Sequence, residues 1–151
     1  MRSAPKPAPA VKLVVDTNTL VSGTLWSGSP ARLVNAILSA PGTLCLSPEI
    51  VIELGNVLAR PKFAGRLAAQ GVTVSEIMLR FQRFSRRVTG AKIAPPPTLR
   101  DPKDLKILAA AVGAKADAIV TGDKDLLVLK EFQGIKILSP RQFVDWMDAQ
   151  K

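Results

Sequence analysis

The chain has 151 residues and a formal net charge of +9, with one cysteine and no histidine. A hydrophobic fraction of 47% suits one folded domain, and no apolar run reaches the length of a membrane helix. Without histidine, the chain cannot carry out Ser-His-Asp hydrolysis or histidine acid–base catalysis, and it cannot form a His/Cys zinc site. The lone Cys45 excludes a disulfide framework, which suits a reducing cytoplasm, and its apolar surroundings predict a buried core residue.

The first ten residues, MRSAPKPAPA, are rich in alanine and proline. They carry no apolar core of the kind that a secretory signal needs. We expect residues 1–10 to form a flexible tail and residues 11–151 to form a single domain, because 151 residues are enough to bury one core.

Along the rest of the chain, short apolar runs alternate with stretches of helical periodicity. The predicted strands are residues 11–15, 43–46, 118–121 and 135–138. The predicted helix starts are the cap–proline pairs Ser29-Pro30, Ser47-Pro48, Asp101-Pro102 and Ser139-Pro140, and the capping box at residues 73–76. Strands without polar alternation that alternate with helices indicate a mainly parallel central sheet covered on both faces. The predicted fold class is therefore α/β, a three-layer α/β/α sandwich.

Acidic residues stand at four places along these elements. Asp16 follows the first strand in VVDTNTLVS, and Glu53 lies among apolar residues in SPEIVIEL. Asp104 falls in the first turn of a predicted helix, and Asp123 follows the third strand together with Asp125 in TGDKDLL. In parallel sheets, ligands bind beyond the carboxyl ends of the strands, so we expect the carboxylates to converge there. Converging carboxylates repel unless they bind a cation, and oxygen ligands suit Mg²⁺ or Mn²⁺.

Each acid taken alone also has an ordinary structural explanation. Asp16 fits a turn at a strand end, and Asp123 fits turn chemistry because it follows a glycine. The dipole of a helix N-terminus favours Asp104 there without any further role. Glu53 would be a surface residue of an amphipathic helix in the ordinary explanation, but a functional role is more strongly indicated, because a carboxylate in an apolar cluster needs a partner or a metal. The combination is what indicates a metal site.

Positive charge is concentrated between Arg60 and Lys103, where ten basic residues stand against two acidic ones. Within this segment, Arg80, Arg83 and Arg87 recur at helical spacing, so we expect one exposed ridge on a basic helix. Such a ridge could contact the phosphates of a nucleic acid. The alternative is a solvated helix face that only aids solubility.

The four acidic segments resemble the successive motifs of PIN-domain nucleases, in matching order and spacing over residues 11–143. The resemblance is closest to the VapC-like toxins of bacterial toxin–antitoxin pairs. It implies a divalent-metal-dependent ribonuclease that hydrolyses phosphodiester bonds in RNA. It also implies a cognate antitoxin protein as partner, and it leaves a homodimer open.

Carried over onto this sequence, the resemblance implies a set of metal-holding acids with polar neighbours. The catalytic, metal-holding acids would be Asp16, Glu53, Asp104 and Asp123, with Asp125 as an auxiliary ligand and Thr17 and Asn18 as supporting residues. One departure is that Lys103 and Leu105 interrupt the acidic run that related chains often show after the aspartate-proline pair. Asp104 keeps the matching register, so the departure does not exclude activity, and whether it lowers the affinity for metal stays open.

Two other functions stay open. A haloacid-dehalogenase-like phosphatase also places an aspartate after its first strand, but it would need a second aspartate where Asn18 stands. A PIN-like domain that has lost catalysis would only bind RNA or a protein partner. Intact acids at all four places favour an active enzyme over that second alternative.

Overall fold

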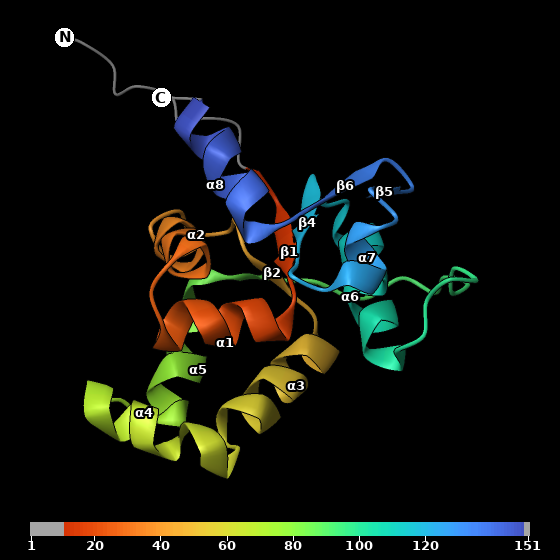
Figure 1. Cartoon of the computed structure of the whole chain (residues 1–151). Helices are drawn as coiled ribbons and strands as arrows, with labels where there is room; N and C mark the ends of the chain where they lie inside the picture. The colour runs from red at the N-terminus through yellow and green to blue at the C-terminus, as the bar shows by residue number, and fades with distance from the viewer. Residues whose placement is uncertain (1–10, 150–151) are drawn as a thin grey trace, which may run out of the picture.

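The computed structural model describes residues 11–149, so the predicted tail of residues 1–10 lies outside the described residues. A mainly parallel sheet flanked by helices confirms the predicted three-layer fold class (Figure 1). The strands are β1 (Leu13–Val15), β2 (Cys45–Leu46), β3 (Arg86–Arg87), β4 (Ala118–Val120), β5 (Glu131–Phe132) and β6 (Ile135–Leu138). The helices are α1 (Thr17–Leu25), α2 (Ser29–Leu38), α3 (Pro48–Leu58), α4 (Ala64–Gln70), α5 (Val74–Phe84), α6 (Pro102–Ala114), α7 (Lys124–Leu127) and α8 (Pro140–Ala149), with a 3-10 turn η1 (Pro61–Phe63) before α4.

The strands lie in the order β1-β4-β6-β5, with β1, β4 and β6 parallel and β5 antiparallel to β6. β2 and β3 form a parallel pair, which a single bridge between Leu13 and Leu44 joins to β1. Every residue of β1 and β4 is buried, because α1, α2 and α8 lie on one side of these strands and α6 on the other (Figure 1). This double cover explains the continuous apolar runs of the sequence.

The core also contains the only cysteine. Cys45 is fully buried in β2, as predicted, and burial raises the pKa of its thiol. Between residues 11 and 149, no helix combines the length and the apolar character needed to cross a bilayer.

Side-chain caps fix most of the predicted helix starts. Ser47, Thr73 and Asp101 each accept a hydrogen bond from a backbone N–H in the first turn of the helix that follows. The prediction that Ser29 caps α2 is wrong, because Ser29 is already the first helical residue. Gly28 precedes it as the cap, without a side-chain bond, and its φ of 108° is readily adopted only by glycine.

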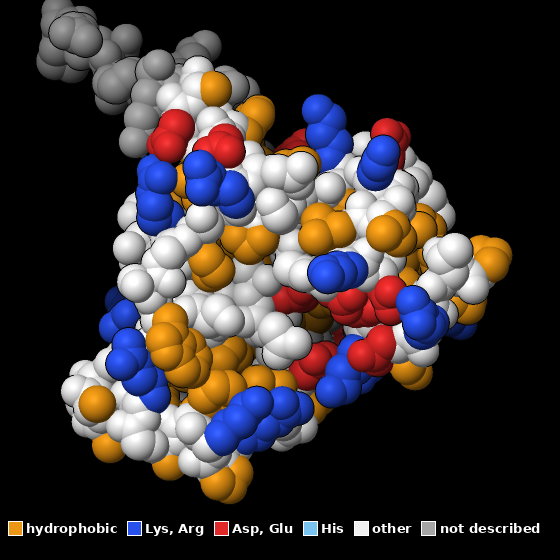
Figure 2. All heavy atoms as spheres, viewed as in Figure 1, with side chains coloured by type: hydrophobic (Ala, Val, Ile, Leu, Met, Phe, Trp, Pro, Cys, Tyr) orange, Lys and Arg blue, Asp and Glu red, His pale blue; other side chains and the backbone are white. Residues whose placement is uncertain are grey.

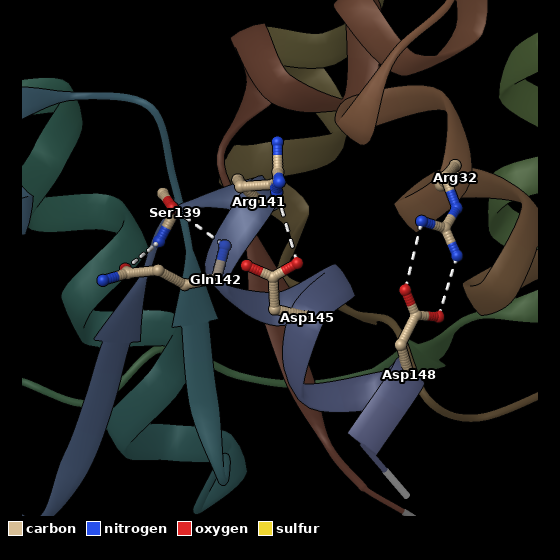
Figure 3. A network of polar contacts seen from close by, with 6 residues as sticks. All are labelled: Arg32, Ser139, Arg141, Gln142, Asp145 and Asp148. Atoms are coloured by element: carbon tan, nitrogen blue, oxygen red, sulfur yellow. Dashed lines mark hydrogen bonds and ion pairs between the residues drawn. The ribbon is translucent and has the colours of Figure 1, made fainter. Parts of the chain in front are cut away.

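A polar network holds α8 in place (Figure 3). Ser139 and Gln142 form a capping box, in which the Gln142 N–H donates to Ser139 Oγ at 3.1 Å and the Ser139 N–H donates to Gln142 Oε1 at 2.8 Å. Near the other end of the helix, the guanidinium of Arg32 donates to both carboxylate oxygens of Asp148, at 2.9 and 3.3 Å. These bonds tie the last helix to α2.

The basic helix ends earlier than predicted. α5 stops at Phe84, and Arg86 and Arg87 form β3 instead of continuing the helix. Two backbone N–H···O bonds, of 2.7 and 3.1 Å, join this strand to the β2 segment. The expected ridge of Arg80, Arg83 and Arg87 is therefore wrong, because Arg87 lies on a strand. The open edge of β2 supplies backbone partners, which the spacing of side chains along a sequence does not reveal.

The strand β5 was not predicted either. It pairs with β6 through the two-residue turn Gln133-Gly134, in which both φ angles are positive, 50° and 81°. Positive φ at both central residues is the geometry of a type I′ hairpin turn. Only two residues of β5 take part in the ladder, too few to produce a recognisable pattern of alternation.

α1 and α2 cross with their backbones close together at Gly23. A Cβ added to Gly23 would lie 2.3 Å from the carbonyl oxygen of Pro30 and 2.4 Å from Cγ2 of Val34. This contact holds α1 against its neighbour, and α1 begins directly after Asp16. The glycine therefore helps to place the first acidic residue.

Gly23→Ala should lower the free energy of unfolding by roughly 1–3 kcal/mol, the usual cost of overpacking, because the backbone carbonyl of Pro30 cannot rotate away. Urea unfolding of both proteins measures the difference. Gly65→Ala on α4 is the matched control, since its added Cβ meets nothing within 4 Å. That variant should keep or slightly raise stability. Equal effects of the two substitutions would contradict this account of the packing.

Candidate metal centre

Three carboxylates from two helix starts meet at the carboxyl end of the sheet. Asp104, Asp123 and Asp125 each offer one oxygen atom, and these atoms lie within 4.8 Å of one another. Asp104 stands in the first turn of α6, whereas Asp123 follows β4 and caps α7, to which Asp125 belongs. Figure 2 shows acidic side chains gathered in a hollow of the viewed face, with lysines and arginines around its edge. The predicted convergence of Asp104 and Asp123 is confirmed.

Asp16 joins this centre through Thr121. The Asp16 carboxylate caps α1, with the Thr19 N–H donating to its Oδ1 at 2.7 Å. The hydroxyl of Thr121 donates to Asp16 Oδ2, and the oxygen of the same hydroxyl accepts from the Asp123 N–H at 3.0 Å. The neighbouring parallel strands β1 and β4 thus present their two terminal acids as one connected unit.

Asp104 is the most deeply buried of the acids. Its side chain is 6% exposed, and among the described residues no donor reaches its Oδ2. Burial raises the pKa of Asp104 to about 7, with further contributions from the charge of Asp123, from a hydrogen bond to that carboxyl, and from the charges of Asp101 and Asp16. An ionised carboxylate in this position costs free energy unless a cation pairs with it.

The arrangement fits a divalent metal ion. The unpartnered Oδ2 of Asp104 is a ready ligand atom, and the oxygens of Asp123 and Asp125 complete an all-oxygen, anionic donor set. Hard cations such as Mg²⁺ and Mn²⁺ take such ligands and fill their remaining positions with water. Arg100 reaches Asp125 at 3.4 Å, but its side chain is 84% exposed, so this is a weak surface pair.

Glu53 lies apart from this group of three. It is half-buried on α3 and lines a cavity together with Arg60, Lys103 and Lys106. The helix α3 therefore brings the glutamate beside the first turn of α6, the turn that also carries Asp104. Its role in metal binding remains a prediction.

The bonds that support Asp16 come from residues that the sequence did not single out. Thr17 is buried and its hydroxyl has no partner among the described residues, while Asn18 is exposed. Thr19 and Thr121 make the hydrogen bonds to the Asp16 carboxylate instead. The one signal for Thr121 was its polar side chain at the end of the apolar strand predicted over residues 118–121.

A PIN domain family profile matches residues 12–125, a stretch that runs from the start of β1 into α7 and contains every acid of the centre. The match spans well over half of the chain. This protein belongs to the PIN domain family. PIN domains are generally metal-dependent nucleases, and they use divalent metals. A comparison with curated proteins gave no match.

The stability of the PIN domain should depend on pH because of Asp104. Without metal, the folded state keeps a proton on Asp104 up to about pH 7, whereas the unfolded chain loses it near the ordinary pKa of 3.8. Because the folded state binds more protons between these values, Asp104 contributes a loss of stability as the pH rises from about 4 to about 7. Asp104→Asn should remove this contribution, so the variant should exceed the wild type in stability above pH 7.

Thermal unfolding of both proteins in EDTA, over a series of pH values, measures this difference. Asp145→Asn on α8 is the control, since that carboxylate pairs with Arg141 on the surface and should leave the pH profile unchanged. Added Mn²⁺ should stabilise the wild type above pH 7 and stabilise Asp104→Asn much less. A stability difference between Asp104→Asn and the wild type that does not vary with pH would contradict the assignment.

Proposed function

We propose that this PIN domain is a ribonuclease that hydrolyses phosphodiester bonds in RNA with Mg²⁺ or Mn²⁺. The observation that carries this proposal is the buried Asp104, whose Oδ2 has no partner among the described residues and whose carboxylate lies with oxygens of Asp123 and Asp125 within 4.8 Å. These three acids would hold the metal. Asp16 would contribute from β1, and Glu53 would contribute from α3.

The chain's own residues would prepare the centre for the reaction. When bound, the divalent metal would lower the pKa of a water for attack on the phosphorus and would stabilise charge on the leaving oxygen. Thr121 and Thr19 fix the orientation of Asp16, so its charge stays directed at the centre. Because the pKa of Asp104 is raised to about 7, a cation that binds there would displace its proton, so metal affinity should rise with pH. Thr17 and Asn18, which directly follow Asp16, would act as supporting residues for the metal-holding acids.

Positive charge supports a nucleic acid as substrate. The net charge is +9, and the segment from Arg60 to Lys103 carries ten basic residues and two acidic ones. Arg80 and Arg83 are exposed on α5, and Arg87 is exposed on β3. We propose that these arginines contact phosphates from two separate elements, not as one helical ridge.

Asp16→Asn should lower the rate of Mn²⁺-dependent cleavage of single-stranded RNA by at least about 100-fold, the upper range seen when a group that orients metal ligands is lost. The substitution takes one charge from the acidic centre while leaving the capping oxygen in place. Cleavage of a labelled oligoribonucleotide, with and without EDTA, measures the rate. Asp145→Asn makes the same chemical change outside the centre and should cleave like the wild type. Equal rates for Asp16→Asn and the wild type would reject the mechanism.

We further propose a VapC-like toxin role, which rests on the resemblance of the acidic motifs. An uninhibited ribonuclease harms its host, so this role needs an antitoxin that blocks the centre. An arginine or lysine from the antitoxin could reach the free Oδ2 of Asp104 and replace the charge of the metal. A charge-assisted bond in this buried position would be strong, because the partner displaces water.

Expression of the wild-type chain alone should therefore arrest bacterial growth, and Asp16→Asn at the same level of soluble protein should not. Growth curves after induction measure the effect, and co-expression of the protein encoded directly upstream should restore growth. Normal growth with abundant soluble wild-type protein would refute the toxin role. That result would not overturn the ribonuclease proposal, which the cleavage assay tests separately.

A further inference from the structure

An exposed aromatic cluster lies at the far end of α1 from the acidic centre. Trp26 closes this helix and is 45% exposed. The ring of Phe63 meets it edge-on with centroids 5.8 Å apart, and the guanidinium carbon of Arg66 lies 5.6 Å from the Trp26 ring. The ammonium of Lys62 lies 5.0 Å from the ring of Phe63. These four residues, Trp26, Lys62, Phe63 and Arg66, form what we call the Trp26 cluster.

The cluster is held rigidly against α1. Arg66 Nε and Gln70 Nε2 both donate to the carbonyl oxygen of Leu25, at 2.6 and 3.0 Å. Leu25 itself is fully buried, so this carbonyl is a fixed anchor for α4. The exposed ring of Trp26 is thus oriented before any partner arrives, which lowers the entropy lost on binding.

The charge around the cluster favours an anionic partner. From Leu54 to Ser75 the chain has no acidic residue, while Arg60, Lys62 and Arg66 are basic. An aromatic ring flanked by cations is the arrangement that stacks a nucleic-acid base and pairs with its phosphates. A surface for a neutral or basic protein would not need this excess of positive charge.

The other tryptophan shows that exposure alone does not produce this arrangement. Trp146 is 44% exposed and packs on Phe143 with ring centroids 5.8 Å apart. Its helix, however, carries Asp145 and Asp148. Asp145 pairs with Arg141 and Asp148 pairs with Arg32, so Trp146 is a matched control that is equally exposed but lacks the excess of positive charge found around Trp26.

The position of the cluster relates it to the acidic centre. α1 has Asp16 as its N-terminal cap and Trp26 as its C-terminal cap. The ten residue steps from Asp16 to Trp26 rise by about 15 Å, a distance that a strand of a few nucleotides can span. A single strand could therefore contact both ends of α1 at once.

We propose that Trp26 stacks on an unpaired base of the RNA substrate, a few nucleotides from the bond that is cut, while Lys62 and Arg66 contact the phosphates. This inference rests on the proposed ribonuclease function and makes single-stranded RNA its substrate, because base faces are covered in a duplex. The Trp26 cluster would then set how far from the stacked base cleavage occurs.

Tryptophan fluorescence tests the proposal directly. In Trp146→Phe, Trp26 is the only tryptophan, and a short single-stranded oligoribonucleotide (~10 nucleotides, within the range that single-strand binders cover) should quench its emission in EDTA, where no strand is cut. In Trp26→Phe, Trp146 is the only tryptophan, and the same oligonucleotide should leave its emission unchanged.

Binding measurements supply the second arm. By fluorescence anisotropy of the labelled oligonucleotide, Trp26→Ala should weaken affinity by about 10-fold, the loss of one stacked base. Trp26→Phe should keep most of the affinity, and Trp146→Ala should keep all of it. Lys62→Gln should reduce the slope of log affinity against log salt by about 0.7.

The outcomes separate this inference from the ribonuclease proposal. Suppose that the wild type binds and cleaves RNA, that Trp26→Ala keeps its affinity, and that RNA does not quench Trp26 in Trp146→Phe. This result would overturn the proposed role of the Trp26 cluster and leave the ribonuclease proposal standing. RNA binding with quenching of Trp26 but without metal-dependent cleavage would support the role of the cluster in RNA binding and overturn the proposed ribonuclease activity. A wild type that binds no RNA would overturn both. A change in Trp26 emission that follows protein concentration without RNA would indicate a second copy of the chain on this surface and would also overturn the inference.

Discussion

Asp104 is a carboxylate that the fold buries beside two others, with an oxygen that no donor satisfies among the described residues. Burial and the neighbouring charge of Asp123 raise its pKa to about 7, because the ionised form is disfavoured in this position. A divalent cation would stabilise the ionised form, since it would satisfy the free oxygen and offset the mutual repulsion. The strands and helix caps around the centre stabilise this arrangement of carboxylates in the folded protein.

That support comes from strand ends and helix starts. Asp16 and Asp123 each cap a helix, where backbone N–H groups and the helix dipole stabilise negative charge. Thr121 links the two caps across β1 and β4, which are parallel neighbours. Parallel strands buried on both faces hold these ends rigidly, which fixes where the acids stand at the carboxyl edge of the sheet. The carboxyl edge of an α/β sheet is suited to such a site for this reason.

Much of this could be predicted from the sequence, because the relevant signals are local. The apolar strands, the caps at Ser47 and Asp101, and the acids after β1 and β4 follow from adjacent residues. The strand at Arg87 could not be foreseen, since its hydrogen bonds come from β2, distant in the chain. Thr121 was missed for the same reason, because its partner Asp16 is 105 positions away. Helical position suggested that Glu53 faces inward, but it could not show that the group of three forms without it.

The most direct test of the central claim is a crystal structure of the protein grown with Mn²⁺, with the metal located by its anomalous scattering. The account predicts one or two peaks between Asp104, Asp123 and Asp125, with carboxylate oxygens at roughly 2.0–2.6 Å and one of them the Oδ2 of Asp104. Such a structure would also show whether Asp16 and Glu53 coordinate the metal. No peak at saturating Mn²⁺, or a peak elsewhere with these three carboxylates unchanged, would contradict the account.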